Sequence, residues 1–251
     1  MVFDDLTILG SGTIVPLPNH GCSGYLLRGD GRPVLLDCGP GTLCRLSEIG
    51  VSAAEIRTLL VTHFHLDHVS DLAALLNSRW LQSPQGRREM EIFGPIGTRA
   101  HLEWLASRMD SWFADYRFVL HEGVGDPSAS SGMRIRAGAT AHTAESLCFR
   151  LEDERGRILF YSGDTDDNEA IVALAEGADI AVIECSMPDD AKLDGHLTPV
   201  LAARIGRRAG VRKLVLTHFY REVTAIDILS RVREVFSGQV ILAEDRMRIP
   251  F

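Results

Sequence analysis

One short segment restricts what the chain can fold into more than any other: residues 58–68 read TLLVTHFHLDH. An apolar run with the composition of a buried strand comes first, and four metal-ligating side chains follow at once. Side chains two positions apart in an extended segment point the same way, so His63 and His65 can converge on one cation. Asp67 and His68 follow where the chain turns into the next helix, and they can face a second cation. The sequence therefore predicts a fold in which a metal site lies at the end of a buried strand.

A catalytic pair of metal ions needs further ligands and a group that bridges the pair. Three candidates, His142, Asp164 and His218, each come directly after a predicted strand. Loops at strand ends often carry functional side chains on a rigid scaffold. Imidazole and carboxylate ligands without a nearby thiolate suit zinc or another first-row divalent metal. We therefore expect two divalent metal ions. Zn²⁺ is the metal that we favour, with Mn²⁺ or iron as alternatives.

Short apolar runs alternate with helical patterns along the chain. Some runs are apolar throughout, which indicates strands buried on both faces. This alternation predicts an α/β fold of sheets covered by helices. The predicted strands are residues 6–10, 24–28, 33–37, 58–62, 90–94, 133–141, 146–151, 157–162, 179–184, 213–217 and 239–243. The predicted helices, with apolar residues at three- and four-residue spacing, are residues 70–82, 98–109, 168–176, 198–210 and 224–236.

The composition is that of a globular protein and excludes several functional classes. The formal net charge is −8, which argues against binding nucleic acid by bulk charge. No apolar stretch is long enough to span a membrane, and the N-terminus lacks the pattern of a signal peptide. The five cysteines form no CxxC pair, so we expect reduced thiols and a cytoplasmic protein. No linker divides the chain, and residues 123–132 read as a surface loop, so we expect one domain over residues 1–251.

These seven candidate ligands form a pattern along the chain: HxHxDH at residues 63–68, followed by His142, Asp164 and His218. This pattern resembles the signature of the metallo-β-lactamase superfamily of metal-dependent hydrolases. The opening LTILGSGTIVP and the turn LLDCGPGT (residues 35–42) resemble the same family, so the resemblance covers nearly the whole chain. It implies a four-layer αββα sandwich with the metals in a cleft at one sheet edge. It assigns the first metal to His63, His65 and His142, the second to Asp67, His68 and His218, and the bridging position to Asp164.

Further motifs resemble the ribonuclease Z-like branch of that superfamily. They are LDCGPGT, IFGP (residues 92–95), GDT (163–165), GHLTPVLAARIGRRAG (195–210) and LVLTHFY (214–220). In ribonuclease Z, the interval between the ligands that correspond to His142 and Asp164 commonly holds an arm that clamps tRNA. Here that interval has 21 residues and a predicted β-hairpin fills it. The chain therefore resembles the phosphodiesterases of this branch that lack the arm.

The expected reaction is attack of a metal-bridged hydroxide on a phosphodiester. Asp67 orients this nucleophile and accepts its proton, and His196 stabilises the phosphate oxygens or protonates the leaving group. Glu184 is a candidate partner for a ligating histidine. The expected substrate is a small anionic phosphodiester or a short RNA, and the resemblance implies a homodimer. The sequence assigns no role to Tyr220, to the basic run over residues 204–213, or to His20, His101 and His121.

Two other functions remain open from the sequence. The same metal set can support a lactonase or another carboxylic ester hydrolase. A metal-binding, RNA-associated subunit without catalysis is the second alternative. The GHLTP and LTHFY motifs favour the phosphodiesterase by resemblance, and the full set of seven ligands argues against the non-catalytic protein.

Overall fold

A computed structural model describes residues 1–83, 88–125 and 132–251 of the chain. Within these ranges the strands form one seven-stranded and one six-stranded sheet. Across the first sheet the order is β13 (Arg248–Pro250), β1 (Phe3–Gly10), β2 (Gly24–Gly29), β3 (Val34–Leu36), β4 (Thr58–Leu60), β5 (Glu89–Gly94) and β6 (Arg117–Glu122). Across the second it is β12 (Gln239–Leu242), β11 (Lys213–Thr217), β10 (Ile180–Glu184), β9 (Ile158–Tyr161), β8 (Leu147–Glu152) and β7 (Arg134–Ala139).

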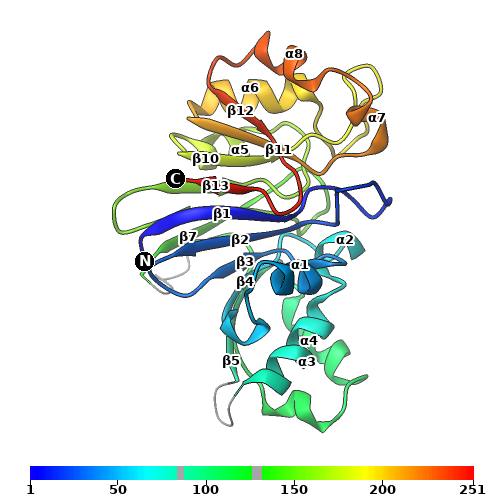
Figure 1. Cartoon of the computed structure of the whole chain (residues 1–251), viewed down its shortest axis with the longest axis vertical. Coiled ribbons are helices and arrows are strands. Elements are labelled where there is room, and N and C mark those ends of the chain that lie inside the picture. Colours follow the sequence, from blue (N-terminus) through cyan, green and yellow to red (C-terminus); the bar gives the residue numbers. More distant parts are fainter. Residues whose placement is uncertain (84–87, 126–131) are drawn as a thin grey trace.

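Helices cover the outer face of each sheet, so the two sheets lie between two helical layers (Figure 1). The four-layer αββα sandwich expected from the resemblance is confirmed. The helices beside the first sheet are α1 (Thr42–Glu48), α2 (Leu66–Val69), α3 (Leu72–Gln82) and α4 (Thr98–Ala106), with the short 3₁₀ helices η1 (Ala53–Glu55) and η2 (Ser111–Asp115). Those that follow strands of the second sheet are α5 (Glu169–Ala175), α6 (Pro199–Ala209), α7 (Arg221–Thr224) and α8 (Ile228–Arg233).

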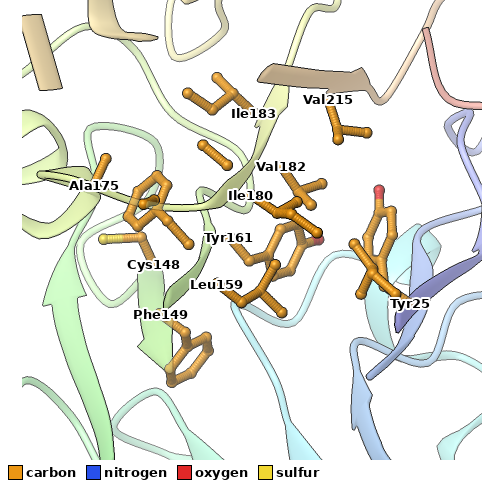
Figure 2. Close-up of a cluster of buried hydrophobic side chains, with 14 of the residues drawn as sticks. Tyr25, Cys148, Phe149, Leu159, Tyr161, Ala175, Ile180, Val182, Ile183 and Val215 are labelled. Carbon is orange, nitrogen blue, oxygen red and sulfur yellow. The ribbon is translucent and has the colours of Figure 1, made fainter. Parts of the chain in front are cut away.

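Alternating side chains of the first sheet enter two different hydrophobic cores. On β2, Tyr25 packs between the two sheets, whereas its neighbour Leu26 packs against the helices on the outer face. The ring of Tyr25 meets that of Tyr161 on β9 with centroids 4.9 Å apart, and Figure 2 shows both rings among the apolar side chains of the second sheet. Burial on both faces explains why the strands read as uninterrupted apolar runs.

Parallel strands bring several chain segments to one edge of the sandwich. Strands β3 to β6 run parallel in the first sheet, and β9 to β12 run parallel in the second. Loops that leave the carboxyl ends of such strands form the usual ligand crevice of an open α/β sheet. The predicted site residues follow β4, β9, β10 and β11 in these loops, except for His142, which follows β7.

Several elements differ from the sequence prediction. Strands β6 and β13 were not predicted, and neither was α1. The single helix predicted over residues 224–236 is wrong: the chain forms α7 and α8, and the side chain of Asp227 accepts a hydrogen bond from Ser230 N at the start of α8. Most of the predicted loop over residues 123–132 lies outside the described residues.

The hairpin expected between His142 and Asp164 is present. The interval from His142 to Asp164 is fully described, and its strands β8 and β9 pair antiparallel, which confirms the hairpin and leaves no room for an arm. All five cysteines are free thiols. In the part of the chain that the structure describes, no helix has the length and apolar character needed to cross a membrane.

Candidate metal centre

The segment after β4 supplies four side chains to one edge of the sandwich. His63 and His68 are almost completely buried, whereas His65 is exposed. Asp67 and His68 were expected where the chain turns into the helix predicted over residues 70–82. They lie instead in the short helix α2, which the sequence does not predict and which precedes α3.

The structure brings all seven predicted ligands together in two groups. The ligand atoms within each group lie within 4.8 Å of one another. One group contains His63, His65, His142 and Asp164, and the other contains Asp67, His68 and His218.

Asp164 lies between the two groups, and each of its oxygens faces a different pair of histidines. Oδ2 lies 3.7 Å from His63 Nε2 and 3.8 Å from His142 Nε2. Oδ1 lies 3.3 Å from His68 Nε2 and 3.4 Å from His218 Nε2. A carboxylate in this position can join two cations.

Three of these ligand atoms are buried without a hydrogen-bond partner: His63 Nε2, His68 Nε2 and Asp164 Oδ1. An unpartnered buried polar atom costs free energy, and native structures contain few of them. Here His68 Nε2 faces Asp164 Oδ1 and His63 Nε2 faces Oδ2 of the same carboxylate. Such a set of nitrogen and carboxylate donors suits a divalent cation. The residues present therefore fit metal ions at this position.

The buried carboxylate of Asp37 holds the ligands that follow β4. It accepts hydrogen bonds from His68 Nδ1 (2.8 Å) and from the backbone N and Oγ1 of Thr62 (both 2.8 Å). Thr62 Oγ1 lies 3.0 Å from His63 Nδ1. The Tyr161 hydroxyl donates to the same carboxylate from the second sheet, at 2.6 Å. These contacts fix the ring of His68 directly and that of His63 through the threonine, with both Nε2 atoms toward Asp164.

Glu184, at the end of β10, has the matching position in the second sheet. Its carboxylate accepts from Thr165 N (2.6 Å), Leu197 N (3.1 Å) and Ser186 Oγ (2.5 Å). It also accepts from His196 Nδ1 at 3.1 Å. Glu184 is therefore not a direct partner of a ligating histidine.

Ser186 connects Glu184 to the predicted ligand His218, because its hydroxyl lies 2.9 Å from His218 Nδ1. The ligand His142 is held instead by a backbone carbonyl, that of Gly195, 3.0 Å from Nδ1. His196 joins the site as well, since one of its ring nitrogens lies within 4.8 Å of ligand atoms of Asp164 and His218.

Two residues that form the site have a left-handed backbone that is unfavourable for non-glycine residues. The φ angles are +54° at Asp37 and +61° at His218. Each residue directly follows a strand, at the point where its side chain must turn into the site. Such strain persists only where surrounding contacts fix it, and it is common at functional sites.

Burial and neighbouring charges set the protonation of the ligands in the absence of metal. Burial, together with the charge of His68, lowers the pKa of His63 to about 2, so this imidazole is neutral. Burial also lowers the pKa of His68, but the carboxylates of Asp164 and Asp37 outweigh it and raise the pKa well above its usual value. For Asp164, burial is outweighed by His218 and His68, which hold its pKa well below the usual range. The carboxylate is thus ionised and ready to bind a cation.

Several other side chains lie where they have no contact with the metal ligands. His121 pairs with Glu91 Oε1 at 2.9 Å, and His101 stacks on Phe64 with ring centroids 4.9 Å apart. In the basic run, Arg208 pairs with Glu169 and Arg212 pairs with Asp179. The exposed arginines of the run therefore lie on the solvated side of α6 and of the turn that follows it, whereas Lys213 begins β11.

Comparisons with known proteins agree with this arrangement. A family model described as "Beta-lactamase superfamily domain" matches residues 32–219. The chain is 32% identical to the ribonuclease Z of Mycobacterium avium (strain 104) over 276 residues, which covers 98% of this chain and 97% of that protein. It is also 32% identical over 241 residues to the uncharacterized protein Rv1339 of Mycobacterium tuberculosis, covering 94% of this chain and 88% of that protein.

Solved structures show the same fold. The short form of human tRNase Z superposes with a TM-score of 0.81 at 29% identity, over 98% of both chains. The metallo-β-lactamase fold protein YhfI of Bacillus subtilis superposes with a TM-score of 0.87 at 22% identity, over 100% of both chains. The fold, the clustered donors and the matched domain define the class: the chain belongs to the metallo-β-lactamase superfamily. Within that superfamily it belongs to the ribonuclease Z-like branch.

Proposed function

We propose that the protein is a binuclear metal-dependent phosphodiesterase that acts on small anionic diesters. The observation that carries this proposal is the position of Asp164, whose two oxygens face two separate sets of histidine nitrogens. The buried, unpartnered ligand atoms support it further. The relatives named ribonuclease Z favour a phosphodiester over another ester.

In this proposal, each of the two groups of ligands holds one cation. The first would be held by His63, His65 and His142, the second by Asp67, His68 and His218, with Asp164 shared. Two bound divalent ions, for which we favour Zn²⁺, would act as Lewis acids. They would neutralise charge on the phosphate oxygens and lower the pKa of a water molecule.

Asp67 is the residue we assign to the nucleophile. Its Oδ2 accepts a hydrogen bond from Ile14 N at 3.2 Å and lies 3.4 Å from His218 Nε2. These contacts fix the carboxylate at the mouth of the site, where it can orient an attacking water and accept its proton.

His196 is the residue we assign to the phosphate or the leaving group. The hydrogen bond between its Nδ1 and Glu184 fixes the imidazole and leaves Nε2 as the ring nitrogen available to substrate. Its ring lies parallel to that of His218, with an angle of 14° and centroids 5.7 Å apart, so it stands directly beside the metal ligands. A donor in this place can stabilise charge that develops on the phosphate or protonate the departing oxygen.

The test uses protein purified without chelator and measures its metal content, its hydrolysis of bis(p-nitrophenyl) phosphate and its turnover of a panel of lactones. We expect two metal ions per chain and hydrolysis of bis(p-nitrophenyl) phosphate. The activity should disappear after chelation and return with Zn²⁺ or Mn²⁺. Asp67→Ala should abolish turnover, and His196→Ala should lower kcat by about 10²-fold or more while metal is retained.

The alternatives give different results in the same assay. Turnover of a lactone panel without diester hydrolysis would replace the phosphodiesterase with a carboxylic ester hydrolase. Fewer than two metals and no hydrolysis would indicate the non-catalytic, RNA-associated subunit. Short RNA as a second substrate, one domain over residues 1–251, a homodimer and a cytoplasmic location remain predictions.

A further inference from the structure

The loop between β1 and β2, residues 11–22, forms one wall at the mouth of the candidate site. We call it the mouth loop. Figure 1 shows it projecting from the edge of the sandwich that also carries α2 and α7. Its contact with the site is the hydrogen bond from Ile14 N to Asp67 Oδ2.

A single buried carboxylate joins the two legs of this loop. Asp245, which follows β12, accepts from Ser11 N (3.2 Å) and Ser11 Oγ (3.1 Å) through Oδ1. Through Oδ2 it accepts from Gly21 N at 2.8 Å and from the Arg45 guanidinium at 3.2 and 3.3 Å. The Asp245 side chain is fully buried. None of the predicted metal ligands contributes to this cluster, so metal binding does not explain why a charged group is buried here.

Backbone contacts make the base of the mouth loop rigid. Gly12 N donates to Gly21 O at 2.7 Å, and Phe219 N donates to Ser11 O at 3.0 Å. A Cβ on Gly12 would lie 2.7 Å from the carbonyl oxygen of His20, so the two legs approach more closely than a side chain permits. Phe219 directly follows the ligand His218, and this fastens the loop to the metal centre.

The tip of the mouth loop is apolar and exposed. Ile14 is 48% exposed and Val15 is 50% exposed. Another exposed apolar side chain adjoins two predicted ligands in sequence: Leu66, 65% exposed, lies between His65 and Asp67. Exposed apolar side chains at the rim of a polar site are suited to contact an apolar part of a ligand.

We infer that the mouth loop selects the group that remains esterified to the phosphate, and that Asp245 is the positioning residue that holds the loop beside Asp67. The class of substrate is a small phosphodiester whose retained group has a flat ring with an apolar face, such as the base of a nucleoside. This inference rests on the proposed phosphodiesterase function. A long polyanion would instead need a rim of cations.

Two diesters that share a leaving group show whether the enzyme distinguishes between the groups that stay on the phosphate. Thymidine 5′-(p-nitrophenyl phosphate) and methyl p-nitrophenyl phosphate both release p-nitrophenolate and differ only in the retained group. The variant V15S should lower kcat/KM for the nucleoside ester by about tenfold and leave the methyl ester nearly unchanged. L81S, at an exposed leucine on α3, is the matched control and should change neither. Equal changes for both esters, or none, would overturn the role of the loop tip.

Asp245→Asn tests the positioning role with a measurement that needs no turnover. Hydrogen exchange of the amides in residues 11–22 should become faster, while metal content stays at the wild-type value and selectivity for the nucleoside ester falls. Unchanged exchange in the loop would overturn the role of Asp245. If this variant does not fold, Arg45→Gln serves instead, because it removes only the guanidinium that contacts Asp245. It should accelerate the same exchange, and unchanged exchange would also overturn the role of Asp245. Glu48→Gln, which removes the other partner of Arg45, is the control.

The two proposals fail separately. If wild-type protein hydrolyses neither ester, the phosphodiesterase proposal is lost, and the exchange experiment still decides whether Asp245 holds the loop.

Discussion

The two halves of the metal centre are built in different ways. The half that belongs to the first sheet comes from one segment of six residues, from His63 to His68, which begins three positions after the last residue of β4. The half that belongs to the second sheet is assembled from separate loops that carry His142, Asp164 and His218. Local spacing determines the first half, whereas only the arrangement of the strands brings the second half together.

Each half nevertheless depends on one buried carboxylate that accepts hydrogen bonds from several donors. Asp37 supports the first half, where it contacts the ligand His68 directly. Glu184 supports the second half, where it contacts His196 directly and His218 only through Ser186. If the proposed assignments are correct, Asp37 serves metal binding, whereas Glu184 mainly serves His196, the group we assign to the substrate.

The largest expected effect is the loss of metal from Asp37→Asn. An amide in place of the carboxylate removes an acceptor from His68 Nδ1, so we expect metal affinity to fall about 10–100-fold. Competition with a fluorescent chelator measures this directly. Glu184→Gln is the matched variant, and it should change the affinity much less.

Glu184→Gln should act on turnover instead. Loss of the carboxylate that holds His196 should lower kcat on bis(p-nitrophenyl) phosphate by about 10²-fold, with KM and metal content nearly unchanged. If Glu184→Gln loses as much metal as Asp37→Asn, the two carboxylates have the same role and the comparison fails.

A smaller effect is expected from the tyrosine that links the halves. Tyr161→Phe removes the donor 2.6 Å from Asp37 and should lower the free energy of unfolding by about 1–3 kcal/mol in urea titrations. It should also weaken metal binding. Tyr25→Phe is the control, because its hydroxyl lies 2.8 Å from Thr217 Oγ1 and does not touch Asp37. Equal metal affinity in the two variants would show that Asp37 does not need its donor from the second sheet.

The smallest effect is expected far from both halves, at Asp153. Burial raises the pKa of this carboxyl group, but hydrogen bonds from Phe3 N and Arg157 outweigh it and lower the pKa below 3.8. The ionised group therefore stabilises the fold above the unfolded pKa, and this contribution is lost as the pH falls through the lower folded pKa. Asp153→Asn should cost about 1 kcal/mol at pH 7 and progressively less below pH 4, with activity and metal content unchanged. Urea unfolding across that pH range tests it, and a cost independent of pH would refute the assignment.

The sequence predicts the first half of the site well because its ligands are close together along the chain. The second half is predicted only because His142, Asp164 and His218 each follow an apolar run. Asp37 stands in the turn LLDCGPGT, yet nothing local shows that it contacts His68, 31 residues away. Ser186 carries no signal at all, because its role depends on the distance between two loops.

The same limit applies to the fold. Central strands such as β4 and β10 are buried on both faces, and their sequences show it. Strand β6 alternates exposed and half-buried residues at the edge of the first sheet, and β13 is three residues long and ends in a proline. An edge strand needs less apolar surface, so its sequence resembles that of a loop.

The distance along the chain between the two halves has a consequence for the newly synthesised protein. Asp67 and His218 lie 151 residues apart, and a ribosome adds roughly 5–20 residues per second. The histidine-rich segment is therefore synthesised roughly 8–30 s before its last partner exists. During that time it offers only a partial ligand set. Full metal loading thus reports that nearly the whole chain has been made and has folded.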